Sequence, residues 1–449
     1  DLLGPEDMTA SGRINLRSFC RRVEGWEYEN LRRQIYAERT LQPQAIEAMA
    51  TALGVPPEYF KEYRQYQMQQ VISDHPDLAD VVYDLVLGRA KSLDATVIPL
   101  ISLALGQLAD HQDLPAATVD RIVDMIVDGT VSDGQAGAFL LALRVKGETG
   151  DEIFGGAEAM RRATTPVEVR SPEPLVDITS TGGDRLGTFN ISTTAAFVAA
   201  GAGARVAKSG GRGQHSLSGA ADLIQALGAR IDLSPADIAR CIEQVGFGFM
   251  FAPLHHRAVR HLLPLRRSLN TPTLFNLLGP ILNPAGVKRQ ITGVYHPRYL
   301  TVLADAMLQL GFEHALVIRG EDGLDEISIT GPTSVVELKD GTVGPPFQIH
   351  PEMFGLRRGD ATALVGGDAH HNADITRRIL CGEAGATRDI VLVNAGAAIY
   401  VAGLADSIDE GVERARESID SGRAWEKLTA FVDFTRAATL AGSTDNLSA

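Results

Sequence analysis

The amino-acid sequence predicts an α/β protein: a helical N-terminal module, a small all-α domain, and a larger α/β domain with a mainly parallel sheet. Three observations support this fold class. Residues 13–90 are rich in Arg, Tyr and Gln and contain patterns of short helices. The pattern stays helical from 98 to about 168. From 175 onward, short β-rich runs alternate with apolar helices, which is typical of a parallel sheet covered by helices.

The domain boundaries are expected where this pattern changes. We expect a helical module at 1–90, a small α domain at 91–172 to which helices of the larger domain can return, and an α/β domain at 173–449. A chain of 449 residues with 45% hydrophobic residues is large enough to bury a sizeable core. No run approaches the roughly 18 uninterrupted apolar residues of a membrane span.

Local signals predict individual elements. Ser132 is expected to cap a helix, and Gly129 and Gly147 are expected to end helices. Four β-rich runs are expected in the larger domain: LVDIT at 175–179, ARVAK at 204–208, HALVIRG at 314–320 and DIVLVNAG at 389–396.

Charge and cysteine content limit the functional classes. The formal net charge of −14 argues against non-specific affinity of the whole molecule for nucleic acid. A site for anionic substrates must therefore concentrate positive charge locally. The three cysteines, Cys20, Cys241 and Cys381, lie far apart without metal-like or paired spacing. They are interpreted as reduced thiols of a cytoplasmic protein, which agrees with the lack of an apolar signal segment at the start of the sequence.

The segment DITSTGGDRLGTFNISTT at 177–194 has the features of a phosphate-binding turn. It runs from an apolar strand through a glycine turn into a helix of small residues. Gly182 and Gly183 lack a Cβ, so the backbone can adopt left-handed conformations and approach an anion closely. The helix that follows presents unpaired N–H groups and the positive end of its dipole. Polar side chains at its start add donors: Asn190, Ser192, Thr193 and Thr194.

Further blocks follow in a recognisable order: STGGD at 180–184, TFNIST at 188–193, KSGGR at 208–212, SGAAD at 218–222, RRSLNTPTLFNLLGPILNPA at 266–285, GEDGLDE at 320–326, GGDAHHNA at 366–373 and RDIVLVNAGAAIYVAG at 388–403. With these blocks, the chain from about Ile98 to Phe434 resembles the anthranilate phosphoribosyltransferase family. More distantly, it resembles the pyrimidine-nucleoside phosphorylases of the same fold. The resemblance implies a two-domain enzyme that forms a homodimer through its α domains.

The resemblance also implies a site for the donor, 5-phosphoribosyl pyrophosphate (PRPP). The implied donor residues are Ser180, Thr181, Gly182, Gly183, Asp184, Thr188, Asn190, Ser192, Thr193 and Lys208. Asp184 can accept hydrogen bonds from ribose or an amide. Lys208 ends the predicted strand ARVAK and is expected to direct its charge at the pyrophosphate; the alternative is a solvated lysine at a strand end.

A magnesium site is implied by the GEDGLDE block. Mg²⁺ is usually held by one or two carboxylates together with phosphate oxygens and water. The family's ligands correspond here to Ser192, Asp325 and Glu326. We expect both carboxylates on a surface turn. The alternative interpretation is a solvated acidic loop.

The acceptor half departs from the family. Its members carry Lys-His-Gly-Asn-Arg in the second glycine loop, whereas this chain has KSGGR at 208–212 and then GQH at 213–215. Arg319 replaces the histidine that commonly precedes the glycine of the metal block. Arg266 is retained and can pair with an acceptor carboxylate. The residues implied in acceptor binding are Ser209, Gly211, His215 and Arg266.

These changes favour an aromatic acid related to anthranilate as the acceptor. The loss of two polar contacts predicts turnover of anthranilate itself lower by roughly 10²-fold, because each missing buried hydrogen bond costs on the order of 1–3 kcal/mol. His215 is the one candidate for proton transfer, with an exposed loop histidine as the alternative. His370 and His371 are adjacent and therefore do not share a helix face; they are interpreted as residues of a loop or helix start.

The N-terminal module looks like the later part of a lambda-repressor-like helix-turn-helix domain. Between Arg13 and Arg39 there are seven Arg against four Glu, and such arginines can contact DNA phosphates. The first helices of that motif are missing or atypical. A helical appendage for dimerisation or docking is therefore the favoured alternative.

Three functional classes follow. The first is a Mg²⁺-dependent transferase that moves 5-phosphoribosyl from PRPP to anthranilate or a similar aromatic acid. The second is a pyrimidine-nucleoside-phosphorylase-like enzyme, which does not need the Asp325–Glu326 pair. The third is a DNA-binding regulator that senses a ligand through the same fold, because a fold by itself does not determine function.

Overall fold

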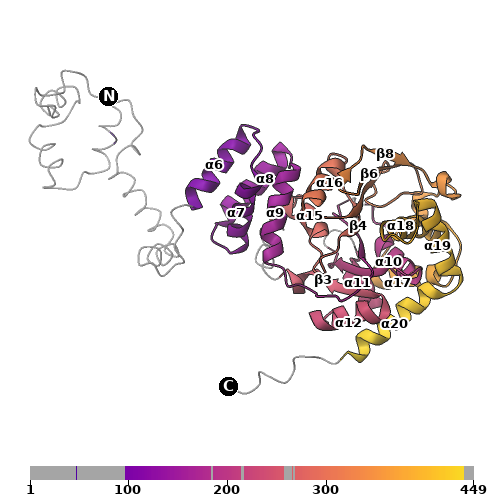
Figure 1. Ribbon diagram of the computed structural model, residues 1–449. Helices are drawn as coiled ribbons and strands as arrows, with labels where there is room; N and C mark the ends of the chain where they lie inside the picture. Colours follow the sequence, from indigo (N-terminus) through magenta and orange to yellow (C-terminus); the bar gives the residue numbers. More distant parts are fainter. Residues whose placement is uncertain are drawn as a thin grey trace, which may run out of the picture. The chain divides into compact units, whose positions relative to one another are not determined.

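The computed structural model describes Glu47 and residues 97–183, 186–213, 217–256, 265 and 268–438. The chain divides into two units, Asp1–Leu93 and Asp94–Ala449, and every element described below belongs to the second (Figure 1). The helix-turn-helix interpretation falls outside the described residues. In the described part of the chain, no helix combines the length and the apolar character that a membrane crossing requires.

Four helices of the described part of the chain precede the sheet: α6 (Val97–Ala109), α7 (Ala116–Val127), α8 (Asp133–Lys146) and α9 (Gly150–Arg162). The predicted cap is confirmed, because the side chains of Ser132 and Gln135 form a capping box at the start of α8. Gly129 and Gly147 follow the ends of α7 and α8 with φ of 69° and 96°, as expected of glycines that end helices.

The sheet has eight strands: β1 (Leu175–Ser180), β2 (Arg205–Gly210), β3 (Phe247–Phe251), β4 (Arg289–Gly293), β5 (His314–Gly320), β6 (Thr333–Lys339), β7 (Thr342–Val343) and β8 (Phe347–Ile349). Its order is β3-β2-β1-β4-β5-β6-β7, and β8 also pairs with β6. β1 to β5 are mutually parallel, whereas β6 is antiparallel to β5. The mainly parallel sheet that the sequence predicts is therefore confirmed.

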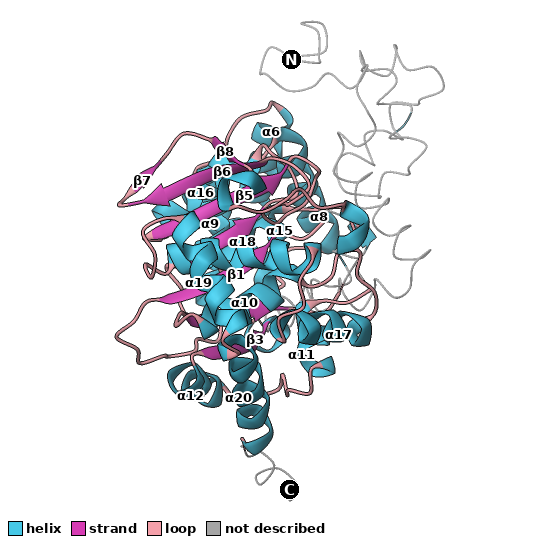
Figure 2. Ribbon diagram, turned by 90° about the vertical axis from the view of Figure 1, so that its right-hand side faces the viewer, coloured by secondary structure: helices cyan, strands magenta, loops and turns pink. Residues whose placement is uncertain are grey.

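Helices cover both faces of the sheet (Figure 2). These are α10 (Ile191–Gly201), α11 (Ala220–Ala226), α12 (Pro235–Val245), α13 (Ala252–His255), α15 (Leu274–Ile281), α16 (Tyr299–Gln309), α17 (Ala369–Leu380), α18 (Ala386–Val401), α19 (Ile408–Asp420) and α20 (Arg423–Ala437). Alternate residues of a strand face opposite sides, so Leu316 of β5 joins the core of α10 and α18. Its neighbour Val317 joins α15, α16 and the helices that precede the sheet.

One predicted β run is wrong. DIVLVNAG at 389–396 lies inside α18, a helix of 16 residues. Its β-branched residues suggested a strand, and burial on nearly every side removes the amphipathic pattern that identifies a helix. Small residues allow the close packing: a Cβ on Gly396 would lie 2.6 Å from the backbone nitrogen of Val412 in α19. Tertiary packing therefore outweighs local β propensity here.

Candidate active site

The parallel strands bring their carboxyl ends together at one edge of the sheet. Ser180 at the end of β1 pairs with Gly293 of β4, and Gly210 at the end of β2 pairs with Phe251 of β3. Open parallel sheets bind ligands outside the carboxyl ends of their strands. The two glycine turns and the GEDGLDE block all follow these ends, and this edge is therefore the candidate active site.

The first glycine turn is held against the end of β4. The backbone N–H of Thr181 donates to the carbonyl of Gly293 at 2.9 Å, and the Thr181 hydroxyl accepts from the N–H of Tyr295 at 3.1 Å. Gly182 and Gly183 are exposed and have φ of 65° and 98°, a region that disfavours other residues. The predicted close approach of an anion to this backbone is therefore geometrically possible.

The start of α10 links three separate segments. The Asn190 side chain donates to the carbonyl of Ser218 at 3.1 Å and accepts from the Ser218 hydroxyl at 3.2 Å. Its oxygen also accepts from the side chain of Asn372 in α17 at 2.9 Å. Ser192 is half-buried in the first turn of α10, and Thr193 is buried. The first residues of this helix are therefore tied to both the SGAAD block and the GGDAHHNA block.

The second glycine loop is organised by a carboxylate. Asp222 accepts from the N–H groups of Gly213 and Gly219 at 3.0 and 2.9 Å and from the Arg212 guanidinium at 2.6 Å. Partial burial raises the pKa of Asp222, but these hydrogen bonds outweigh it and hold that pKa below its ordinary value. Gly211 completes the loop by accepting from the N–H of Ala221 at 3.0 Å.

Lys208 lies inside the sheet rather than at its surface. It is only 2% exposed, and its Nζ donates to the carbonyl of Ile178 at 2.5 Å. Burial lowers the pKa of Lys208, while the negative charges of Asp177 and Glu326 oppose that shift. The solvated alternative is therefore wrong. The residue also stands two positions before the end of β2, and not at the end as expected.

The neighbouring carboxylate, Asp177, is fully buried. It accepts from the Asn283 amide at 2.8 Å and from the N–H of Ser209 at 3.3 Å. Ser209, which the resemblance assigned to the acceptor, is thus held through its backbone by a residue of β1. Sequence reasoning missed both Asp177 and Asn283, although each lies within a quoted block or strand.

The Asp325–Glu326 pair is buried rather than on a surface turn, with each residue 6% exposed. The backbone of Asp325 lies against Gly293: a Cβ on Gly293 would be 1.7 Å from the Asp325 carbonyl oxygen. The turn before the pair is closed by Asp322, which accepts from the hydroxyls of Ser328 and Thr330 at 2.5 Å each. The interpretation of this block as a solvated acidic loop is therefore wrong.

An asparagine of α18 fixes the chain after this pair. The side-chain oxygen of Asn394 accepts from the N–H of Ile327 at 3.0 Å, and its amide donates to the carbonyls of Ile327 and Ile390 at 2.9 and 2.8 Å. Asn394 is fully buried, so these hydrogen bonds satisfy its polar groups in the core. This role explains the asparagine in the RDIVLVNAGAAIYVAG block.

Three predicted residues fall outside the described part of the chain, and two further residues have contacts of their own. Asp184, His215 and Arg266 are not among the described residues. Thr188 forms an isolated bridge with Val365, and Arg319 donates to the neighbouring carbonyl of Gly320 at 3.1 Å.

The GGDAHHNA block contributes an asparagine rather than its histidines. His370 and His371 are exposed in the first turn of α17, as expected. Asn372 is 1% exposed; its side-chain oxygen accepts from the N–H of Gly367 at 2.8 Å, and its amide reaches Asn190. Sequence reasoning missed Asn372, although it follows the two histidines directly.

The end of β3 supplies further residues that the sequence did not reveal. Phe251 lies beneath the guanidinium of Arg212, with 5.7 Å between the Arg212 Cζ and the ring centroid. His256 accepts from or donates to the Thr164 hydroxyl at 3.0 Å through Nδ1, so this segment also touches the residues after α9. Burial, together with the neighbouring His255, lowers the pKa of His256 to about 4, so its imidazole is neutral near pH 7.

Comparisons with known proteins agree with this architecture. The model of the glycosyl transferase family a/b domain matches residues 172–425, and that of the family's helical bundle domain matches 103–164. The anthranilate phosphoribosyltransferase of Rubrobacter xylanophilus is 50% identical over 334 residues, 74% of this chain and 97% of the relative. That of Azorhizobium caulinodans is 51% identical over 339 residues, 76% of this chain and 96% of the relative.

Solved structures give the same result. The anthranilate phosphoribosyltransferase from Thermus thermophilus is 41% identical, with a TM-score of 0.70, and the match covers 74% of this chain and 99% of that structure. The Saccharomyces cerevisiae enzyme in complex with PRPP and Mg is 29% identical, with a TM-score of 0.69, covering 75% of this chain and 98% of that structure. By its fold, its site and these relatives, the chain belongs to the anthranilate phosphoribosyltransferase family.

Proposed function

We propose that this protein transfers the 5-phosphoribosyl group of PRPP to anthranilate and releases pyrophosphate. One observation carries the proposal. The exposed glycine turn at 182–183 and the buried Asp325–Glu326 pair lie at the same edge of the sheet. The family relatives named above, which are about half identical to this chain, support anthranilate as the acceptor. Neither the phosphorylase nor the DNA-binding sensor gains support from them.

The donor site is built to hold an anion and a developing cation. Transfer builds positive charge at the anomeric carbon while pyrophosphate leaves, and fixed dipoles stabilise such charges best in a water-poor site. The exposed backbone of Gly182 and Gly183 and the start of α10 can bind phosphate oxygens. Lys208 contributes positive charge from within the sheet, close enough to interact electrostatically with Glu326.

Mg²⁺ fits the carboxylate pair. Asp325 and Glu326 supply hard oxygen ligands, and two carboxylates suit an ion that also keeps phosphate oxygens and water. No group of three or more His, Cys, Asp or Glu side chains with metal-site geometry occurs among the residues that the structure describes. The resemblance to the family implies the Ser192 hydroxyl as a further ligand, and we propose that these three groups hold the ion together with the donor. The ion would neutralise pyrophosphate charge as it develops.

The acceptor is tested by measuring pyrophosphate release and loss of anthranilate from a mixture with PRPP and Mg²⁺. We expect turnover that chelation of Mg²⁺ abolishes, and no release of base from thymidine or uridine with phosphate. A panel of aromatic acids, compared by kcat/KM in the wild type and in Arg266→Ala, decides how much the altered loop at 208–215 matters. A preference of 10²-fold or more for another acid would replace anthranilate in the proposal.

The homodimer expected from the resemblance has a candidate surface on α6 and α8. Leu103 in α6 and Leu141 and Val145 in α8 are 64%, 37% and 75% exposed, and α6 and α8 pack against each other. Leu141 and Val145 are four residues apart and so share one face of the helix. Apolar side chains that face solvent in this way are typical of a surface covered by a partner.

Analytical ultracentrifugation tests this surface. We expect the wild type to sediment as a dimer and the Leu103→Glu/Val145→Glu variant as a monomer, because burying two new carboxylates in the interface is unfavourable. Met353→Glu is the matched control, since Met353 is an exposed apolar residue of the 3-10 helix Pro351–Phe354. A monomeric wild type, or a variant that stays dimeric, would contradict the assignment.

The division at 1–90, 91–172 and 173–449 and the cytoplasmic location remain proposals. The cysteines that the structure describes are consistent with a reducing compartment: Cys241 is buried, Cys381 is exposed, and both are free thiols. Burial raises the pKa of Cys241 to about 12, so it stays an unreactive thiol. Cell fractionation tests the location, and limited proteolysis with mass spectrometry tests the boundaries.

A further inference from the structure

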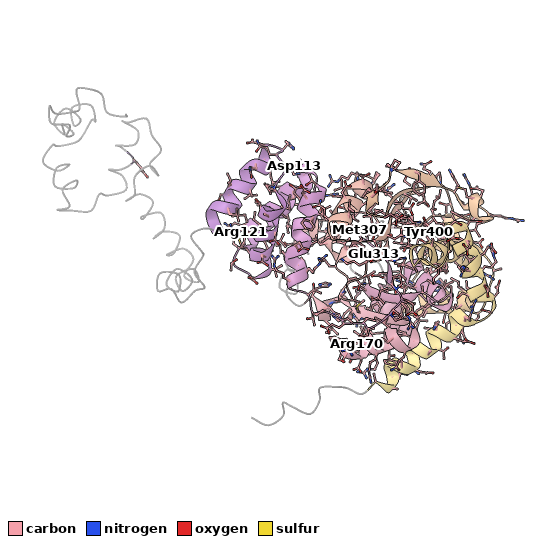
Figure 3. The ribbon with its side chains drawn as sticks, viewed as in Figure 1. Asp113, Arg121, Arg170, Met307, Glu313 and Tyr400 are labelled. Atoms are coloured by element: carbon pink, nitrogen blue, oxygen red, sulfur yellow. The ribbon has the colours of Figure 1, made fainter. Side chains whose placement is uncertain are left out.

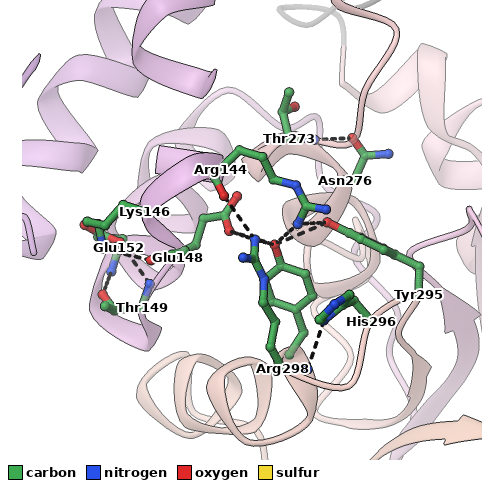
Figure 4. Close-up of polar contacts among 12 residues, drawn as sticks. Arg144, Lys146, Glu148, Thr149, Glu152, Thr273, Asn276, Tyr295, His296 and Arg298 are labelled. Atoms are coloured by element: carbon green, nitrogen blue, oxygen red, sulfur yellow. Dashed lines mark hydrogen bonds and ion pairs between the residues drawn. The ribbon is translucent and has the colours of Figure 1, made fainter. Parts of the chain in front are cut away.

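The segment LRVKGET at 143–149 comprises the last turn of α8 and the link to α9, and it has no part in the site described so far. Lys146 serves the helical domain itself: its Nζ donates to Asp113 at 2.7 Å and to Glu152 at 3.0 Å. The two other charged residues of this segment, Arg144 and Glu148, point away from Lys146 and from its partners. Arg144 and Glu148 reach toward residues 295–299, which lead from β4 into the first residue of α16 (Figure 4).

Arg144 contacts two tyrosines of this connection. Its Nη1 donates to the hydroxyl of Tyr295 at 2.9 Å and to that of Tyr299 at 2.5 Å. The guanidinium carbon also lies 5.2 Å and 5.8 Å from the two ring centroids, within the range of cation–π attraction. A hydrogen bond from a charged donor is stronger than a neutral one, so this contact restrains both rings.

Glu148, from the same helical domain, also contacts this connection. Together these residues form one polar cluster: Arg144, Glu148, Tyr295, Arg298 and Tyr299. Its Oε2 accepts from the Tyr299 hydroxyl at 2.7 Å and from the Arg298 guanidinium at 2.9 Å, and its side chain is buried. Arg298 also donates to the backbone carbonyl of Arg144 at 3.3 Å. Burial and the charge of Glu148 raise the pKa of Tyr299, so its hydroxyl keeps its proton and remains a donor. The cluster thus joins the helical domain firmly to the start of α16.

Tyr295 links this cluster to the first glycine turn, residues 181–183, which we call the donor turn. Its backbone N–H donates to the Thr181 hydroxyl at 3.1 Å. A Cβ built on Gly183 would lie 3.6 Å from the Cβ of Tyr295, so the turn packs directly on this side chain. One residue therefore contacts Arg144 through its hydroxyl and the phosphate-binding turn through its backbone and Cβ.

We propose that Arg144 and Tyr295 are positioning residues for the donor: through them the helical domain holds Thr181 and Gly183 in the conformation that receives the phosphates of PRPP. The inference rests on the proposed function for the identity of that ligand. A site must be held close to its productive geometry to bind well, and residues that fix the first contacts determine that precision. Affinity for the donor should therefore depend on the helical domain.

The test is Tyr295→Phe, which removes only the hydroxyl and keeps the ring and the backbone contact. We expect KM and Kd for PRPP to rise by about tenfold, the effect expected when a hydrogen bond to a charged partner is lost. We expect kcat and the KM of the acceptor to stay within about twofold, because the acceptor side is not held by this hydroxyl. Arg144→Gln should give a similar result.

The double variant shows whether the two residues act together. If Arg144 acts through Tyr295, Tyr295→Phe/Arg144→Gln should weaken PRPP binding no more than Tyr295→Phe alone, because Arg144 has no hydroxyl left to act on at residue 295. Additive losses would overturn the proposed path from Arg144 to the turn. Arg144→Lys, which keeps a charged donor, should recover part of the affinity.

Tyr400→Phe is the matched control. Tyr400 (labelled in Figure 3) also hydrogen-bonds to charged partners, donating to Glu337 at 2.7 Å and accepting from Lys339 at 3.1 Å. It lines a cavity with Arg289 and His314, which begin β4 and β5, and so lies at the opposite edge of the sheet from the donor turn. We expect lower thermal stability and an unchanged KM for PRPP in this variant.

Hydrogen exchange separates this inference from the proposed function, because it needs no substrate. In the ligand-free protein, the amides of Thr181 and Tyr295 should exchange faster in Tyr295→Phe and Arg144→Gln than in the wild type or in Tyr400→Phe. Unchanged exchange at these amides, or a KM for PRPP within twofold of the wild type in both variants, would overturn the positioning role. A wild type that binds no PRPP but shows the exchange difference would instead contradict the proposed function alone.

Discussion

Replacing both carboxylates of the proposed metal site is expected to abolish phosphoribosyl transfer. We expect kcat/KM for PRPP to fall by at least about 10³-fold in Asp325→Asn/Glu326→Gln, because removing a single group that stabilises developing charge costs on the order of 10²–10³. The amide variants are chosen since each residue is only 6% exposed, and truncation to Ala would leave space in the core. Initial rates at saturating Mg²⁺ and calorimetric titration with PRPP measure the effect.

The control for this prediction is Glu321→Gln. Glu321 belongs to the same GEDGLDE block but is exposed, and its side chain accepts from the Ser334 hydroxyl at 2.6 Å. We expect its kcat/KM to stay near that of the wild type. Circular dichroism and the melting temperature establish that the double variant is folded. Residual turnover above about a tenth of the wild-type rate would show that these carboxylates do not hold the ion.

The sequence predicted the local elements on which the proposed site is built. A strand, a glycine pair and a polar helix start are contiguous in 175–194, so their pattern was sufficient to predict β1, the glycine turn and the start of α10. The caps of α8 were predictable for the same reason, because Ser132 and Gly147 act within a few residues of themselves. In each case the contact lies within one local segment.

The residues that sequence reasoning missed act across long separations. Asn372 reaches Asn190, Asn394 holds Ile327, and Asp177 binds Asn283. Each is a buried polar group whose role depends on a partner from a different element, and nothing in the local pattern identifies that partner. The burial of Lys208 was missed for the same reason. Its position near a strand end left a solvated side chain open as an alternative, whereas the sheet and the carboxylates around it enclose the side chain.

A substitution of Gly293, at the end of β4, tests whether activity depends on the position of the Asp325–Glu326 pair as well as on its charge. A Cβ at this position would lie 1.7 Å from the carbonyl oxygen and 2.5 Å from the carbonyl carbon of Asp325, both backbone atoms. Neither can turn away as a side chain would, so Gly293→Ala must move the chain that carries Asp325 or the end of β4. The carbonyl of Gly293 also accepts from Thr181, so either movement disturbs the donor turn as well.

We therefore expect Gly293→Ala to lower kcat/KM by about 10²-fold or more, since a displacement of about 1 Å in a site can cost that much. A loss of stability of roughly 1–3 kcal/mol should accompany it, as overpacking usually produces. Gly331→Ala is the control, because a Cβ on Gly331 meets no atom within 4 Å. The concentration of Mg²⁺ that gives half-maximal activity should rise in Gly293→Ala and stay constant in Gly331→Ala. If Gly293→Ala melts lower yet keeps its wild-type dependence on Mg²⁺, the contact between Gly293 and Asp325 supports the fold and does not set the geometry of the metal site.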